Sequence, residues 1–95
     1  MAALWIAHVS VTDEEAYMKY AAIATEAIAE HGGSFIARGG RYLQLEGTDR
    51  PRNVVARFPT FEAAEACYNS PRYQQALNFA RGASERDLVI VETSE

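Results

Sequence analysis

The chain has 95 residues, of which 48% are hydrophobic and 23% charged, and its formal net charge at pH 7 is -4. This composition is ordinary for a folded domain and excludes an intrinsically disordered chain. The negative charge argues against a nucleic-acid-binding protein, because phosphate contacts favour a basic surface, and it also disfavours an acidic partner. The length predicts one domain over residues 1–95.

Cysteine usage and hydropathy bear on location. Cys67 is the only cysteine, so the chain has no intramolecular disulfide and nothing indicates an oxidising compartment. No segment approaches the roughly 18 apolar residues of a membrane span. The strand-like residues begin almost at the N-terminus, without the features of a signal peptide. We therefore expect a cytoplasmic protein.

The first predicted element is a strand over Leu4–Val11, whose odd-numbered residues form an apolar side. Thr12 and Glu15 have the spacing of a capping box, which predicts that a helix begins there. Gly32–Gly33 can end this helix. Its apolar residues recur at helical intervals, and the predicted inward positions are Ala16, Tyr17, Tyr20, Ala24, Ala27 and Ile28.

Two further strands form a predicted hairpin. Ser34–Arg38 reads as the second strand, and we expect Gly39–Gly40 to kink it and carry it on through Tyr42–Glu46. A turn rich in glycine, aspartate and proline follows. Asn53–Phe58 should then pair back as the third strand.

The last third of the chain predicts two helical segments and a strand. Thr60 can cap a helix over Phe61–Tyr68. A third helical segment starts at Ser70–Pro71, with serine as the cap and proline at the first helical position, and Gly82 ends it. Asp87–Glu92 is the final predicted strand.

The predicted order β-α-β-β-α-α-β indicates an α+β, ferredoxin-like fold with an antiparallel sheet and all helices on one face. The opposite face would carry Ile6, Ile36 and Val55 beside the polar residues His8, Arg38 and Arg57, which is too apolar for a face in water. We therefore expect a homodimer in which two open sheet faces meet. The predicted helix-facing layer comprises Trp5, Ala7, Val9, Phe35, Ala37, Val54, Ala56 and Phe58.

Short motifs along nearly the whole chain also resemble a known family. They are Asp13, Tyr17, Tyr20, Gly32-Gly33, Ala37-Arg38-Gly39-Gly40, Glu46-Gly47, Val54-Val55, Phe58-Pro59, Tyr68, Ser70-Pro71, Tyr73 and Val91-Glu92. In this order and spacing they are similar to domain-of-unknown-function family 1330 of the dimeric α+β-barrel superfamily. The resemblance implies a ferredoxin-like protomer and a dimer built by packing two sheets.

The resemblance implies less about function. The wider superfamily includes cofactor-independent monooxygenases, muconolactone isomerases, haem-binding enzymes and ligand-sensing regulatory domains, so the fold alone predicts no chemistry. The chain has no haem-ligand pattern and no grouping of acids, histidines or cysteines typical of a metal site. We predict no bound metal and no cofactor.

The predicted ligand-binding site centres on Arg38, Gly39 and Gly40, because two adjacent glycines in a strand pattern indicate a bulge or a close backbone approach. Residues 38–57 contain five arginines and two acids, a local charge of +3, which leaves -7 for the rest of the chain. We expect Arg38 and Arg57 to converge on the open sheet face and to bind a carboxylate or enolate through bidentate hydrogen bonds. The alternative is that these arginines form ion pairs with acids of this chain or of a partner.

Three other side chains are candidates with a structural alternative. Tyr68 and Tyr73 flank the break at Ser70–Pro71 and can close one side of a cleft, although core tyrosines share this spacing. His8 is the only group in the predicted strands that titrates near neutral pH, which makes it a candidate general base, or else a structural histidine.

These observations favour a homodimer that binds a small anionic or aromatic organic molecule in a cleft between sheet and helices. One alternative is a purely structural or regulatory dimer in which the arginines serve the fold. Another is a cofactor-independent monooxygenase or isomerase. The residues leave open whether the protein is an enzyme.

Overall fold

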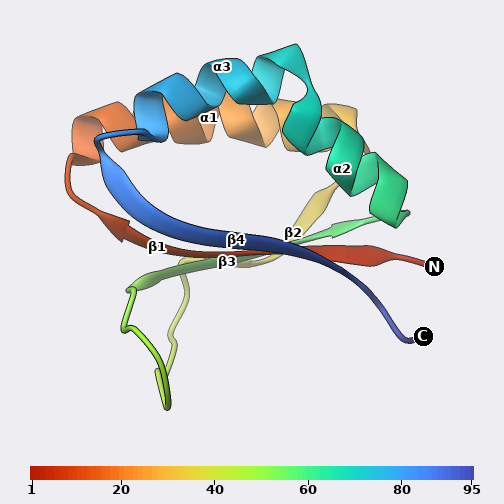
Figure 1. Ribbon diagram of the computed structural model, residues 1–95, viewed down its shortest axis with the longest axis horizontal. Helices are drawn as coiled ribbons and strands as arrows, with labels where there is room; N and C mark the ends of the chain where they lie inside the picture. The colour runs from red at the N-terminus through yellow and green to blue at the C-terminus, as the bar shows by residue number, and fades with distance from the viewer.

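The computed structural model describes residues 1–95 as a four-stranded antiparallel sheet with three helices over one face (Figure 1). The strand order across the sheet is β2-β3-β1-β4, and every neighbouring pair is antiparallel. This arrangement confirms the predicted ferredoxin-like fold. The elements are β1 (Ala3–Val11), α1 (Glu14–Glu30), β2 (Ser34–Arg38), β3 (Arg52–Phe58), α2 (Phe61–Asn69), α3 (Pro71–Ala80) and β4 (Ser84–Glu92).

Helix α1 has a different N-cap from the one that the sequence predicts. Asp13 is the cap, and its Oδ1 accepts a hydrogen bond from the backbone N–H of Ala16 at 3.2 Å. The backbone N–H of Thr12 instead donates to the carbonyl oxygen of Ala83 at 2.8 Å. The capping-box prediction was therefore wrong by one residue, and the N–H of Asp13 also bonds to Ala83, at 3.1 Å, so both residues join the end of β1 to the segment before β4.

The caps of the other two helices are as predicted. The Thr60 hydroxyl accepts from the N–H of Ala63 at 3.0 Å at the start of α2. The Ser70 hydroxyl accepts from the N–H of Tyr73 at 3.2 Å, and Pro71 occupies the first position of α3. The chain thus changes direction between α2 and α3, as Figure 1 shows, while both helices stay on the same face of the sheet.

A β-bulge in β2 changes which side chains face the helices. Phe35 pairs with Ala56, but Ala37 pairs with Val55, so Ile36 is the extra residue. Because side chains alternate along a strand, the bulge turns Arg38 to the helix side of the sheet and Ala37 to the open side. The predicted placement of Ala37 in the helix-facing layer and of Arg38 on the open face was therefore wrong.

The predicted continuation of β2 through Tyr42–Glu46 is absent. Residues 39–51 form neither helix nor strand, and this loop projects from the side of the sheet opposite the helices (Figure 1). Gly39 adopts a φ of +67° and its N–H donates to the carbonyl oxygen of Asn53 at 2.9 Å, after which the chain leaves the sheet. A strand needs a hydrogen-bonding neighbour, and β3 pairs on that side only with Ser34–Arg38.

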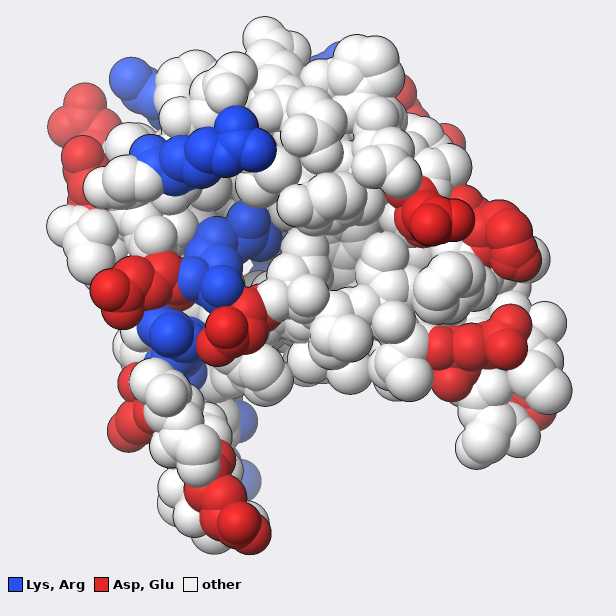
Figure 2. Space-filling view, in the orientation of Figure 1, with Lys and Arg blue, Asp and Glu red and all other residues white.

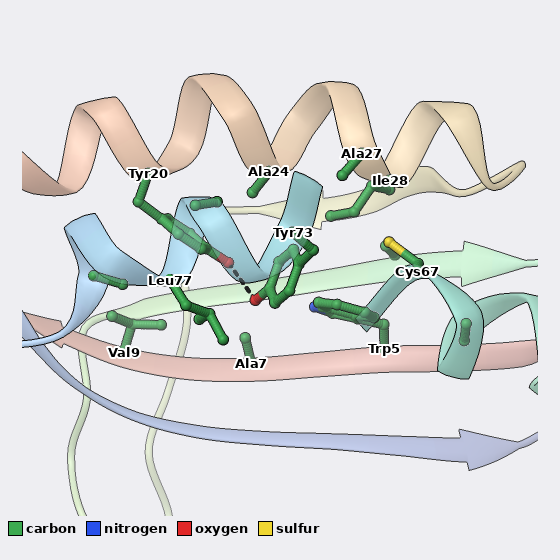
Figure 3. Close-up of a cluster of buried hydrophobic side chains, with 14 of the residues drawn as sticks. Trp5, Ala7, Val9, Tyr20, Ala24, Ala27, Ile28, Cys67, Tyr73 and Leu77 are labelled. Carbon is green, nitrogen blue, oxygen red and sulfur yellow. Dashed lines mark hydrogen bonds between the residues drawn. The ribbon is translucent and has the colours of Figure 1, made fainter. Parts of the chain in front are cut away.

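The hydrophobic core lies between the sheet and the helices. Trp5 is central, with Tyr73 packed edge-on at 5.0 Å between ring centroids and Phe58 tilted at 5.7 Å. Figure 3 shows side chains from α1, α2 and α3 converging on β1 in this layer. The predicted layer is otherwise confirmed, because Trp5, Ala7, Val9, Ala56 and Phe58 are fully buried and Phe35 and Val54 are half-buried.

The other face of the sheet has no helix over it (Figure 1). The register places Leu4 beside Val91, and Ile6 between Val55 and Val89, on this open face. The largest apolar side chains on it are half-buried or exposed. None of the three helices is both long and apolar enough to cross a membrane.

Candidate functional site

A small cavity lies between α1 and the helix side of the sheet. Its volume is about 40 Å³, enough for a few water molecules or one small polar group. Its lining is mostly apolar, with four polar side chains, which are Thr25, Arg38, Arg52 and Arg86. We call it the arginine cavity. The apolar part of the lining consists of Trp5, Ala7, Tyr17, Tyr20, Ala21, Ala24, Ile28, Phe35 and Val54.

Arg86 comes from β4, where it pairs with Val9 in the helix-facing register. Its Nη2 donates to the hydroxyl of Tyr20 at 2.8 Å and to that of Tyr73 at 3.3 Å. The guanidinium lies over the Tyr20 ring, 4.6 Å from the centroid. Its Nε is buried and has no hydrogen-bond partner, and no carboxylate forms an ion pair with it. A charged donor is thus left unsatisfied inside the protein.

The two tyrosines do not neutralise this charge. Tyr20 from α1 and Tyr73 from α3 point toward each other and share a hydrogen bond of 2.8 Å between their hydroxyls (Figure 3). Burial raises the pKa of Tyr20 and of Tyr73 above the ordinary value of 10.0, so both hydroxyls stay protonated at neutral pH. Arginine keeps its proton at any working pH. The cluster therefore carries a net positive charge.

Arg38 and Arg52 add two more guanidinium groups. Arg38, at the end of β2, donates from Nη2 to the Thr25 hydroxyl at 2.7 Å and lies over the ring of Phe35, 4.2 Å from the centroid. Arg52, at the start of β3, lies 5.3 Å from the centroid of the Tyr17 ring. Neither forms an ion pair. Arg38 is exposed and Arg52 half-buried, so we call them the outer arginines.

Three other arginines form ion pairs, unlike the three that line the cavity. Arg50 binds Glu85 at 3.3 Å and Asp87 at 2.9 Å. Arg57 pairs with Glu95. A third ion-pair group joins Arg72 of α3 to Glu26 and Glu30 of α1. In Figure 2 basic side chains gather at the end of the molecule where β4 begins, between the helices and the root of the loop.

A second, wider hollow adjoins the outer arginines. It has a volume of about 270 Å³ and is lined by Val11, Glu14, Gly39, Pro51 and Arg52. Arg52 lines both spaces.

The structure separates the residues predicted for the site. Arg38 lines the cavity, Gly39 lines the hollow, and Tyr73 belongs to the cluster around Arg86. Gly40 is exposed, with no neighbouring atom near the position of a Cβ. Tyr68 packs against Trp5 and Tyr73 but does not line the cavity.

Arg57 and His8 lie on the other side of the sheet. Arg57 pairs with Leu4 in the register of the open face, so the predicted convergence of Arg38 and Arg57 was wrong. The bulge in β2 is the reason, because it moves Arg38 to the helix side. His8 is exposed on the open face, where its Nδ1 shares a hydrogen bond of 2.6 Å with Asn53 Oδ1. The sheet therefore separates His8 from the arginine cavity.

Sequence reasoning missed Arg52 and Arg86 as site residues. The predicted last strand began at Asp87, whereas β4 begins at Ser84. With those added residues, Arg86 takes the same register as Leu88 and Ile90, which face the helices. A charged residue in an inward register is a signal that a longer strand prediction would have shown.

Comparisons with known proteins find one matching family and several solved structures with a similar fold. The family model described as "Domain of unknown function (DUF1330)" matches residues 2–94. No curated protein sequence gives a significant match. Among solved structures, a protein of unknown function from Rhodopseudomonas palustris has a TM-score of 0.79 at 18% identity, covering 99% of this chain and 83% of that one.

Two further solved structures are similar in fold. A dimeric ferredoxin-like protein of unknown function from Jannaschia sp. has a TM-score of 0.74 at 13% identity, covering 98% of this chain and 100% of that one. A cofactor-independent oxygenase from Streptomyces nogalater has a TM-score of 0.66 at 14% identity, covering 99% and 94%. At such identities the likeness concerns the fold.

Proposed function

The chain belongs to the DUF1330 family, and from its arginine cavity we propose that it binds a small organic anion with an aromatic or apolar body. The observation that carries the proposal is the unneutralised guanidinium of Arg86, with a buried Nε that has no partner. Burying a charge is costly unless it is paired, so such a group is expected where a ligand supplies the missing partner. A carboxylate or enolate oxygen accepts hydrogen bonds from arginine and has the required charge.

The shape of the site supports an end-on arrangement. The arginine cavity, at about 40 Å³, admits only the charged group of the ligand. The rings of Phe35 and Tyr17 beneath the outer arginines offer apolar surface next to it. The hollow of about 270 Å³ beyond Arg52 has room for the ligand body. The rings of Phe35 and Tyr17 favour a monocarboxylate or enolate with an apolar group next to its charged end.

The side chains of the arginine cavity support ligand binding, and none of them is a general base at neutral pH. Its titratable side chains are three arginines and two tyrosines, and burial raises the pKa of Tyr17 and Tyr20 above the ordinary value. The candidate general base His8 lies on the opposite face of the sheet. The fold shared with a cofactor-independent oxygenase therefore does not lead us to propose that reaction here.

The test compares charged and neutral ligands of the same shape. We expect benzoate and phenylacetate to raise the melting temperature and to bind in calorimetry, and benzamide to do neither. Arg86→Met should weaken benzoate binding by about tenfold or more, because it removes a charge-assisted hydrogen bond. Arg81→Met is the matched control, since Arg81 is exposed at the end of α3 and outside the cavity. Equal binding of benzoate and benzamide, or equal loss in both variants, would contradict the proposal.

We also propose that the protein forms a homodimer through the open sheet face. Support comes from the apolar residues of that face and from the Jannaschia structure, which shares the fold and is described as dimeric. Sedimentation velocity should give the mass of two chains at micromolar concentration. Val89→Asp, in the middle of the face, should shift the protein to monomers, whereas a single-chain mass for the unmodified protein would contradict the proposal.

A further inference from the structure

The loop of residues 39–51 presents apolar side chains to solvent on the open side of the sheet. Leu43 is 80% exposed and Leu45 81% exposed, more than any other large apolar residue of the chain. Figure 1 shows the loop pointing away from its own sheet, on the side without helices. The two leucines are therefore not covered by the chain that carries them.

Two side-chain hydrogen bonds join residues within the loop. The Tyr42 hydroxyl donates to Asp49 Oδ1 at 2.7 Å, and the Gln44 side-chain amide donates to the Glu46 carbonyl oxygen. Leu43 and Leu45 take no part in these bonds, and both side chains are exposed. The alternating pattern that predicted a strand at this position thus leaves two apolar side chains without a partner in the chain.

The open sheet face has a polar half near the loop and an apolar half away from it. In the polar half the charged groups are paired within the chain, because Arg50 at the end of the loop binds Ser10, Glu85 and Asp87. The apolar half presents exposed valines, since Val89 is 53% exposed and Val91 44% exposed. The register puts Val91 beside Leu4, at the end of the sheet farther from the loop root.

Two-fold symmetry matches these two uncovered surfaces. When a two-fold axis between two facing sheets runs across the strands, the loop of each chain lies over the far, apolar end of the other sheet. We propose that the segment Tyr42–Leu45 of each chain docks on the apolar half of the open sheet face of a second copy. This inference rests on the self-association proposed above and adds the contact that fixes the relative direction of the two chains.

The first test measures the dimer dissociation constant by sedimentation equilibrium. The double variant Leu43→Ser/Leu45→Ser should raise it by about tenfold or more, because two apolar side chains lose their burial at the contact. Met18→Ser is the matched control, since Met18 is an exposed apolar residue on α1, on the helix side of the molecule. The control should leave the constant within about twofold of the unmodified protein.

A cross-link supplies a second readout that does not depend on affinity. Chains carrying Leu45→Cys are mixed with chains carrying Val91→Cys and oxidised, and a disulfide-linked heterodimer is expected. Chains carrying Met18→Cys in place of Leu45→Cys should give none. An unchanged dissociation constant in the double variant, or the absence of the Leu45–Val91 cross-link, overturns the docking proposal while leaving a sheet-face dimer. A monomeric unmodified protein overturns both, and neither result bears on anion binding.

Discussion

The Arg86 guanidinium donates to the Tyr20 hydroxyl at 2.8 Å and lies 4.6 Å from the centroid of the same tyrosine ring. One side chain thus provides both an acceptor and a π-face for the buried cation. It provides no negative charge, because burial raises the pKa of Tyr20 and keeps its hydroxyl protonated. Tyr20 therefore holds the Arg86 guanidinium in position but does not neutralise its charge.

Arg86→Met should weaken ligand binding without lowering the stability of the protein. We expect the free energy of unfolding of the ligand-free protein to stay the same or to rise by about 1–4 kcal/mol, since an apolar group replaces an unpaired buried ion. The Tyr20 and Tyr73 hydroxyls would keep their hydrogen bond to each other. Urea unfolding of both proteins without ligand measures the change. A loss of stability of more than about 2 kcal/mol would show instead that Arg86 is a structural residue.

Much of the fold could be predicted from local patterns. The caps Thr60 and Ser70 act on the residues that follow them within one turn, and Pro71 has a fixed backbone preference, so short-range chemistry determines α2 and α3. The cap of α1 was misassigned by one residue because Thr12 and Asp13 are adjacent and both are residue types that favour the N-cap. The residue type alone therefore does not fix the first turn of α1.

The candidate site was harder to predict because two backbone details decide it. The bulge at Ile36 depends on how β2 aligns with β3, and this alignment alone brings Arg38 to the helix side. The first residues of β4 include Arg86, whose partners Tyr20 and Tyr73 come from two different helices. The bulge at Ile36 leaves no motif in the sequence, and the cluster leaves only the charged Arg86 in an inward strand register.

Gly33 and Gly40 should respond differently to the same substitution. A Cβ at Gly33 would lie 2.6 Å from Ile28 Cγ2 and 2.8 Å from Phe58 Cε2, both in the buried core. We expect Gly33→Ala to lower the free energy of unfolding by about 1–3 kcal/mol, because the packed side chains must shift. Gly40→Ala, with no atom within 4 Å, should change it by less than about 0.5 kcal/mol. Urea unfolding checks both, and equal effects would contradict the close approach at Gly33.

Stability should fall in alkaline solution. Burial raises the pKa of the Cys67 thiol from 9.0 to about 11, and Glu30 adds to the shift. Burial also raises the pKa of Tyr17, Tyr20 and Tyr73 above 10.0. The unfolded chain therefore loses these protons at lower pH than the folded chain, so the stabilisation is complete below pH 9 and declines as pH rises through the folded pKa values.

Urea unfolding between about pH 8 and pH 10.5 measures this decline. Cys67→Ala should make the decline shallower from pH 9.0 upward, so that most of the remaining decline lies above the ordinary tyrosine pKa of 10.0. A free energy of unfolding that is level throughout, or that rises with pH, would show that these groups are not held protonated by burial.

The outer arginines should act on ligands through longer-range attraction than Arg86 does. Arg38 is exposed and Arg52 half-buried, so salt screens their charges, whereas the buried Nε of Arg86 is shielded from ions. We expect benzoate to bind several-fold more weakly when salt is raised from about 0.05 M to 0.5 M. In Arg38→Gln/Arg52→Gln the affinity at low salt should be lower and nearly independent of salt. Calorimetry at both salt concentrations tests this, and a double variant as salt-sensitive as the unmodified protein would place the steering charge elsewhere.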